Sequence, residues 1–239
     1  MSTSPEIAPP QMILDYWFAA PKSEWDRDSG PPEHIEEINL ALWWGREPCG
    51  VREIDPQTRV RIDEEMATLF QGTIMAAEKG TLLEGVSEWT SDELKESVGG
   101  LALLILNGFI HPSIHRNDQR KVLANERVSE TLAKMMIDLN ADTSEEFGLY
   151  ERLFIYRTLL KSGFREKKDL GQDKVKQLLS ETQVNVVTAP ALACLQQYAT
   201  DLEEAWSIFD LNPYRRKVMG NNSTEEELEF MEAKPWGHV

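Results

Sequence analysis

Helix-start signals followed by apolar residues at helical spacing recur along most of this chain. The pair Asp55-Pro56 is such a signal, and apolar residues follow it at intervals of three and four until Gly80. The pairs Thr90–Glu93 and Thr143–Glu146 have the spacing of a capping box. Further helices are predicted to begin near Pro10, Asn117, Leu170, Pro190 and Thr224. The chain is therefore predicted to fold as an all-α protein.

Two segments interrupt this pattern. Residues 183–188 are strand-like, but a strand that short with no visible partner cannot form a sheet, so we expect an extended connector. Residues 21–55 are rich in proline, glycine and charge, and are predicted to form an excursion or lid that carries Trp43 and Trp44. With 239 residues, the chain fits one large helical domain over residues 1–239.

The central helix is predicted to break at Asn107-Gly108. Pro112 lacks an amide hydrogen and disfavours helical geometry in the residue before it, so the helix should not resume. Residues 109–115 are therefore predicted to form a turn at the mouth of a helix pair. Polar side chains would gather at this turn.

Composition excludes several classes of partner. The chain has 25 Lys and Arg against 41 Asp and Glu, a net charge of −16, which should repel a phosphate backbone or an anionic membrane. No apolar stretch reaches the roughly 18 residues that span a bilayer. The two cysteines, Cys49 and Cys194, are too few for a disulfide framework and are expected to be free thiols. We expect a cytoplasmic protein that binds neither nucleic acid nor membrane.

Several motifs occur in an order typical of one family. They are Ile13 to Phe18 (ILDYWF), Trp43-Trp44, Leu101 to Leu106, Glu151 to Tyr156, and Phe209 to Arg216 followed by Gly220 and Ser223 to Glu227. Together these resemble the domain of unknown function 924 family over nearly the whole chain. The resemblance implies a tetratricopeptide-like stack of antiparallel helices, which agrees with the helices predicted from the residues alone.

The same resemblance shows where this chain departs from the family's polar pattern. The family typically reads Asp-Gln-Phe-Pro-Arg-Asn and then Arg, whereas this chain has Asn107 to Pro112 (NGFIHP) and then His115-Arg116. A family His-Ser-Glu corresponds to Lys161-Ser162-Gly163, and a Gly-Arg-Phe-Pro-His-Arg-Asn to the run from Asp210 to Arg216. The apolar helix faces stay regular while the polar positions change, which indicates a repurposed pocket.

The candidate site residues include four replaced positions that remain polar, Asn107, His111, Lys161 and Tyr214, and Arg215, which matches the family pattern. The candidate catalytic donors, placed against a carbonyl or enolate oxygen, are His111, Arg116, Lys161, Tyr214 and Arg215. The candidate substrate-binding residues are Tyr16, Trp43, Trp44, Asn107 and Phe109. Ordinary structural roles are open to each of them, because aromatic residues at helical spacing are usually core and surface cations usually pair with nearby acids.

No cofactor or metal site is predicted. His111 and His115 have a spacing that could hold a metal ion, but Pro112 should prevent a regular helix from aligning them and no carboxylate or thiolate lies beside them in the sequence. No nucleophile elbow, P-loop or dinucleotide-binding glycine pattern is found.

Two functions remain open. The first is a cofactor-independent enzyme that encloses an apolar small molecule between helices and catalyses an isomerisation, dehydration or cyclisation, including a pericyclic one, in secondary metabolism. The second is a binding module whose helices present a groove to a peptide or protein partner. No repeat of about 34 residues is visible, which weakens the second interpretation.

Overall fold

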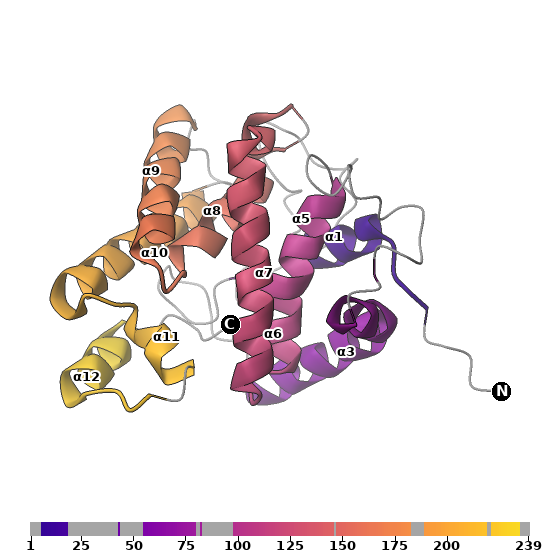
Figure 1. Cartoon of the computed structure of the whole chain (residues 1–239), viewed down its shortest axis with the longest axis horizontal. Helices are drawn as coiled ribbons and strands as arrows, with labels where there is room; N and C mark the ends of the chain where they lie inside the picture. The colour runs from indigo at the N-terminus through magenta and orange to yellow at the C-terminus, as the bar shows by residue number, and fades with distance from the viewer. Residues whose placement is uncertain are drawn as a thin grey trace.

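The computed structural model describes residues 6–18, 43, 55–79, 82, 98–145, 147–182, 189–218 and 221–234 (Figure 1). The helices are α1 (Pro10–Phe18), α3 (Pro56–Glu78), α5 (Val98–Ile105), α6 (His111–Ile114), α7 (Gln119–Asp138), α8 (Leu149–Leu160), α9 (Arg165–Glu181), α10 (Ala189–Phe209), α11 (Pro213–Val218) and α12 (Glu225–Ala233). Within these ranges the protein is all-α and has no strand. None of the helices described is long and apolar enough to cross a membrane.

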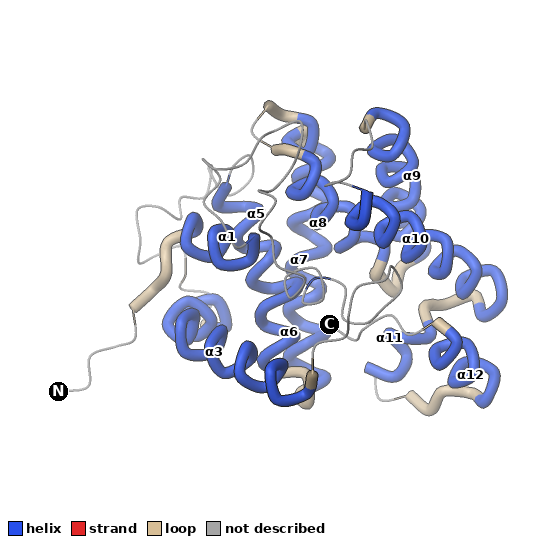
Figure 2. The backbone as a smooth tube through the Cα atoms, turned by 180° about the vertical axis from the view of Figure 1, so that it is seen from behind, coloured by secondary structure: helices blue, strands red, loops and turns tan. Residues whose placement is uncertain are grey.

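Helix α7 stands at the centre of the molecule (Figure 1). The helices α5 and α6 pack on one side of it, with α1 against α5 and α3 against α6. On the other side α7 contacts α8, α8 contacts α9, and α9 contacts α10. The view from behind shows the same order, with α11 and α12 together at one end (Figure 2). The described residues share one hydrophobic core that extends from α1 to α10.

Aromatic side chains from distant parts of the chain meet in this core. The ring centre of Phe154 on α8 lies 5.1 Å from that of Phe109 and 5.6 Å from that of Trp17. Trp43, which we predicted as part of a lid, is fully buried against Phe154 at 5.4 Å, and its Nε1 donates to the backbone oxygen of Trp17 at 2.9 Å. The core position predicted for Trp17 is confirmed, and Trp43 lies in the same core.

The predicted break of the central helix is wrong. After α5 the chain forms one wider π-helical turn over Leu106–Ile110 and continues directly into α6. In this turn the amide of His111 donates to the carbonyl of Leu106, five residues earlier. Pro112 is therefore accommodated inside a helix, because the wider turn does not need the hydrogen bond from residue 112 to residue 108 that an α-helix would make.

The predicted helix caps have mixed outcomes. Asp55 accepts hydrogen bonds from the amides of Gln57 and Thr58, and Thr224 forms a complete capping box at the start of α12, as predicted. The predicted helix start at Thr143 is wrong: Thr143 ends a short 3-10 turn and its hydroxyl donates to Asn140 O, while α8 begins later, at Leu149. Glu146, the other member of the predicted box, is not among the described residues. A hydroxyl already engaged with the preceding turn cannot mark the start of α8.

Other predictions fall partly or wholly outside the residues that the structure describes. These are the excursion over residues 21–55 apart from Trp43 and Asp55, the Thr90–Glu93 capping box, and the connector 183–188. Of the two cysteines, Cys194 is disulfide-bonded, and Cys49 is not among the described residues. The prediction of free thiols is wrong for Cys194, because two cysteines are enough for a single bridge whatever their separation in sequence.

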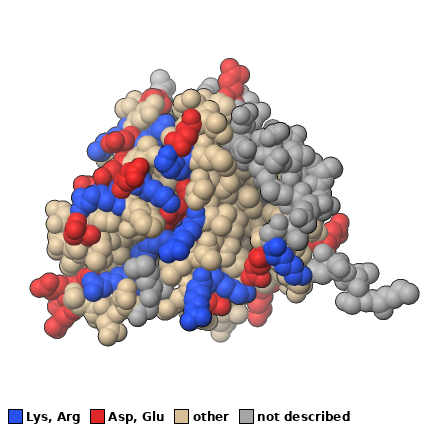
Figure 3. Space-filling view, in the orientation of Figure 1, with Lys and Arg blue, Asp and Glu red and all other residues tan. Residues whose placement is uncertain are grey.

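The surface charge is mixed on the face seen in Figure 3. Basic and acidic side chains are interspersed on the side that carries α9 to α12, and a largely uncharged strip follows α7. The net charge of −16 is therefore not gathered into one acidic field on this face.

Candidate functional site

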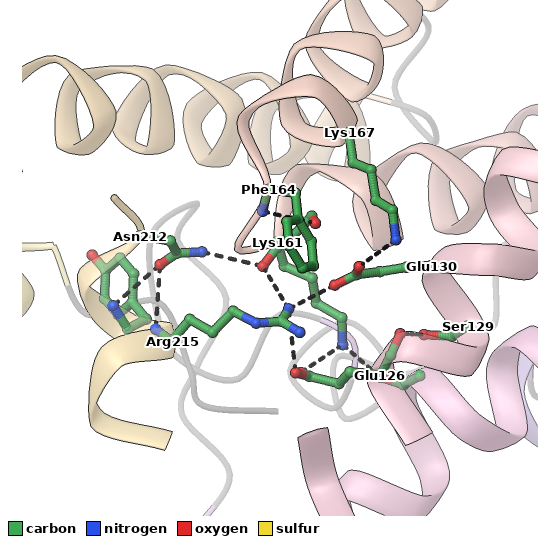
Figure 4. Close-up of polar contacts among 11 residues, drawn as sticks. Glu126, Ser129, Glu130, Lys161, Phe164, Lys167, Asn212 and Arg215 are labelled. Carbon is green, nitrogen blue, oxygen red and sulfur yellow. Dashed lines mark hydrogen bonds and ion pairs between the residues drawn. The ribbon is translucent and has the colours of Figure 1, made fainter. Parts of the chain in front are cut away.

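Four charged side chains converge where α7, the end of α8 and α11 approach one another (Figure 4). We call Glu126, Glu130, Lys161 and Arg215 the ionic cluster. Lys161 Nζ lies 3.3 Å from Glu126 Oε1, and Arg215 NH1 lies 3.4 Å from Glu126 Oε2 and 2.7 Å from Glu130 Oε1. The second oxygen of Glu130 contacts Lys167 Nζ at 2.9 Å. All four members are buried, so water screens these pairs weakly.

Local structure positions each member of the cluster. Glu126 and Glu130 are four residues apart on α7 and so lie on one face of it. Lys161 is the C-cap of α8. The side-chain oxygen of Asn212 accepts from the amide of Arg215 at 3.4 Å, while its Nδ2 donates to the Lys161 carbonyl at 3.2 Å. Asn212 thus holds the start of α11 against the end of α8, which brings Arg215 beside Lys161.

The π-helical turn over Leu106–Ile110 also contacts Lys161. Lys161 Nζ donates to the carbonyl oxygen of Gly108 at 2.6 Å and lies 4.6 Å from the centre of the Phe109 ring. The guanidinium of Arg157, one helical turn earlier on α8, lies 5.1 Å from the same ring and 5.8 Å from the ring of Tyr198. Two cations therefore lie near the Phe109 ring, an arrangement in which ring and cation attract each other.

Gly163 makes room for Arg215. A Cβ atom on residue 163 would lie 3.0 Å from Cδ and 3.1 Å from Nε of Arg215, closer than side chains normally approach. The family pattern typically has glutamate here, so the present path of Arg215 depends on one of the departures found in the sequence. In this chain Arg215 pairs with Glu126 and Glu130 from α7.

Burial shifts the pKa values of the groups around Phe109. Desolvation lowers the pKa of Lys161, opposed by the nearby carboxylate of Glu126. Desolvation also lowers the pKa of Arg157 to about 10 and raises that of the Tyr198 phenol to about 12. Lys161 thus gives up a proton more readily than a solvent-exposed lysine, a property that is common at functional sites.

A second polar group, the His111 cluster, consists of Glu78, His111, His115, Lys121 and Asn125. Glu78 Oε1 lies 3.3 Å from His111 Nε2, 4.0 Å from His115 Nε2 and 2.8 Å from Lys121 Nζ. Asn125 Nδ2 lies 3.3 Å from His111 Nε2. Burial, with a smaller contribution from the neighbouring His115, lowers the pKa of His111 to about 4. The first reason given against a metal site is wrong, because the helix continues past Pro112. The carboxylate that is missing beside the histidines in the sequence is brought by Glu78 from α3.

The structure brings together only some of the predicted site residues. Lys161 and Arg215 share the ionic cluster, and Phe109 lies beside it. Asn107 is on the same π-helical turn, but its Nδ2 donates to the carbonyl of Leu103 on α5 at 2.8 Å. His111 belongs to the His111 cluster.

The remaining predicted residues point elsewhere. Arg116 pairs with Asp63 on α3, and the hydroxyl of Tyr214 donates to the carbonyl oxygen of Lys234. Tyr16 packs edge to face on Phe70 with ring centres 5.3 Å apart. Trp43 lies in the aromatic core, and Trp44 is outside the described residues.

The acids of both clusters were not among the predicted site residues. Glu126 and Glu130 fall on the buried face of α7 with Val122, Ser129 and Ala133. A glutamate at a core position of an amphipathic helix is a signal for a buried partner, and it was available in the sequence. Glu78 offered no such signal, because its partners lie far away along the chain.

The fold and the ionic cluster define a helical protein with charged groups enclosed between its helices. The chain belongs to the family described as "Bacterial protein of unknown function (DUF924)", which matches residues 13–234 and confirms the resemblance. Its structure is similar to that of the protein of unknown function ATU0120 from Agrobacterium tumefaciens, with a TM-score of 0.57 and 16% sequence identity over 94% of this chain and 97% of the other. That likeness shows a shared fold. No curated protein matches the chain.

Proposed function

We propose that this protein is a cofactor-independent enzyme acting on a small molecule with an apolar body and a carbonyl or carboxylate oxygen. The observation that carries the proposal is the setting of Lys161, a buried cation held beside an aromatic ring and a carboxylate. The reaction class is an isomerisation, dehydration or cyclisation, which needs orientation and polarisation of the substrate.

Lys161 has hydrogen-bonding capacity for a ligand. An ammonium group carries three donors, and two of them have acceptors in Gly108 O and Glu126 Oε1. The Phe109 ring lies beside the same ammonium. A substrate oxygen above this ring would accept the third hydrogen bond, and the apolar part of the substrate would rest on aromatic surface.

One side of the ionic cluster is fully buried, and the other side is slightly exposed to solvent. The side chains of Lys161, Glu126 and Arg215 keep 7%, 8% and 8% of their surface exposed, whereas that of Glu130 keeps none. Solvent therefore reaches the cluster at these three side chains, and Glu130 anchors Arg215 from the buried side. A ligand would approach from the Lys161 side.

The carboxylate of Glu126 would supply the base that an isomerisation needs. In an isomerisation, Glu126 would take a proton from the carbon next to the substrate carbonyl while Lys161 stabilises the enolate oxygen that forms. The same proton, returned to another carbon, gives the product, so no oxidant or co-reactant is needed. In a cyclisation, Lys161 would act only by withdrawing electron density from the carbonyl.

The arrangement of helices supports a further part of the proposal. Helices α7, α8, α9 and α10 contact one another in succession, as they would in a tetratricopeptide-like stack. Lys161 lies at the end of α8, and Arg215 lies on α11, which follows α10 in the chain. Their side chains come together between these helices. A groove that binds peptides would instead spread its determinants along an exposed face, which favours the enzyme over the binding module.

A thermal-shift screen tests the proposal. Wild-type protein would be melted with a panel of hydrophobic carboxylates, enones and 1,3-dicarbonyl compounds, and each hit repeated with Lys161→Met. The matched control is Lys174→Met, which also removes a lysine paired with a buried acid, Asp142 at 2.9 Å. We expect hits that stabilise wild type and Lys174→Met but not Lys161→Met. Hits that stabilise all three proteins equally, or no hits at all, would contradict the proposal.

A further inference from the structure

We propose that Glu78, His111 and His115 form a binding site for a divalent transition-metal ion of the zinc class. This site goes beyond the proposed function, because its three ligands belong to the His111 cluster and none of them to the ionic cluster. The inference rests on the distances between the ligand atoms, on the elements that hold them, and on the types of donor that they supply.

The ligand atoms already lie close together. Glu78 Oε1, His111 Nε2 and His115 Nε2 face one another, with one ligand atom from each residue within 4.8 Å of the others. A tetrahedral zinc ion bonds to nitrogen and oxygen at about 2.0–2.2 Å, which separates neighbouring ligand atoms by about 3.3–3.6 Å. The distance of 3.3 Å between His111 and Glu78 meets this geometry. The 4.0 Å distance to His115 requires only a small rotation of a side chain that is partly exposed.

The fold holds two of these ligands on one helix and brings the third from another. His111 and His115 are four residues apart at the start and the C-cap of α6, with ring centres 4.4 Å apart. Glu78 is the last residue of α3, which packs against α6. The π-helical turn before α6 makes this possible, because it carries the helix past Pro112. A bound ion would tie the end of α3 to α6.

The donor set indicates which metal would bind. Two imidazole nitrogens and one carboxylate oxygen suit Zn²⁺, Co²⁺ or Ni²⁺, whereas Mg²⁺ and Ca²⁺ prefer oxygen ligands alone. Three ligands from the protein leave a fourth position for water or a small ligand. His111 is almost fully buried and would fix the ion on the inner side.

Lys121 forms an ion pair with the carboxylate of Glu78. Its Nζ lies 2.8 Å from Glu78 Oε1, and its side chain is 41% exposed. An ion pair with that exposure contributes little to stability, so a metal ion can displace it and the lysine can turn into solvent. Lys121 is thus a competitor for the site, and its removal should strengthen metal binding.

Titration of the chelator-treated full-length protein tests the site. Co²⁺ would be followed by its visible absorption bands and Zn²⁺ by calorimetry, with one equivalent expected for each. His115→Ala and Glu78→Gln should each weaken binding by more than about 100-fold, since loss of a direct ligand should cost at least as much as loss of a supporting hydrogen bond. His238→Ala, which removes another histidine of the chain, should leave affinity and stoichiometry unchanged.

Lys121→Met gives a second, opposite test. We expect its affinity for Zn²⁺ to rise by about two- to fivefold, the range that corresponds to a surface ion pair. Lys134→Met, which breaks the exposed pair with Asp138 at 2.7 Å, is the matched control and should bind like wild type. The proposal is overturned by an absence of stoichiometric binding, by binding that persists in His115→Ala or Glu78→Gln, or by an affinity that does not rise in Lys121→Met. Circular dichroism would check that each variant is folded.

Discussion

Lys161 Nζ donates a hydrogen bond of 2.6 Å to the backbone carbonyl of Gly108, the carbonyl that an α-helix would pair with the amide of residue 112. Because residue 112 is proline, that amide hydrogen does not exist. The end of α8 is therefore bonded to the π-helical turn of the central helix. The same contact sets the ammonium beside Phe109 and within reach of Glu126.

The pairing of Lys161 with Glu126 should be visible as energetic coupling. Lys161→Met and Glu126→Gln each leave a buried charge with fewer partners, and each should lower the free energy of unfolding by about 3–5 kcal/mol. The double variant should cost less than the sum of the two by more than about 1 kcal/mol. Urea denaturation measures all three, and additive costs would show that the two groups do not interact.

A double-mutant cycle on Lys134 and Asp138 provides a reference value for the coupling energy. These residues form an exposed pair four residues apart on α7. Their coupling should be small, as is usual for exposed helix pairs. If this exposed pair were coupled as strongly as Lys161 and Glu126, burial would not be what strengthens the Lys161–Glu126 pair.

Gly163→Ala should destabilise the protein by about 1–3 kcal/mol, the usual cost of forcing extra volume into a packed site. The added methyl group would lie 3.0 Å from Cδ of Arg215 and would push the guanidinium away from Glu126 and Glu130. Denaturant unfolding measures the loss. In an Arg215→Met background the same alanine should cost clearly less, and an equal cost in both backgrounds would contradict the proposed contact.

Gly171→Ala tests the contact between α8 and α9. Its Cβ would lie 2.9 Å from the backbone nitrogen of Leu160, an atom that cannot move without distorting α8. Alanine gains up to about 1 kcal/mol over glycine in a helix, but the clash should outweigh this and give a net loss of about 1–2 kcal/mol. A stabilised variant in thermal or urea unfolding would show that the two helices separate easily.

The N-cap of α3 should make stability depend on acid pH. The Thr58 hydroxyl and the amides of Thr58 and Gln57 lower the pKa of Asp55, because they stabilise its charged form in the folded state. The resulting stabilisation is fully present above the unfolded pKa of about 3.9 and is lost as the pH falls through the lowered folded value.

Asp55→Asn isolates this effect, since it keeps an acceptor oxygen and removes the charge. The stability difference between wild type and Asp55→Asn, measured by urea unfolding, should shrink between pH 6 and pH 3. Thr58→Val, which removes the hydroxyl donor, should show part of the same change. A difference that stays constant over this range would count against the cap.

Local signals allowed much of the helical fold to be predicted. The cap at Asp55 and the box at Thr224 depend on residues within three positions of each other, so the sequence is enough to find them. The turn expected after Asn107 was wrong because the rule that proline ends a helix assumes α-helical hydrogen bonds. A π-helical turn removes that conflict, and no pattern in the sequence distinguishes it from a break.

The site was predicted less completely, because its members lie far apart in sequence. Arg215 and Glu130 are 85 residues apart, and His111 and Glu78 are 33 apart. Comparison with the family pattern led to Lys161, which departs from it, and to Arg215, which matches it, but their acidic partners on α7 were not among the predicted site residues. Arg116 and Tyr214 were also predicted, and the fold turns them toward other partners.

A crystal structure of the wild-type protein with the strongest ligand of the thermal-shift screen tests the central claim most directly. The account predicts that a ligand oxygen lies within hydrogen-bonding distance of Lys161 Nζ and that the apolar part of the ligand contacts Phe109. A ligand bound elsewhere, with Lys161 still bonded only to Gly108 and Glu126, would contradict it.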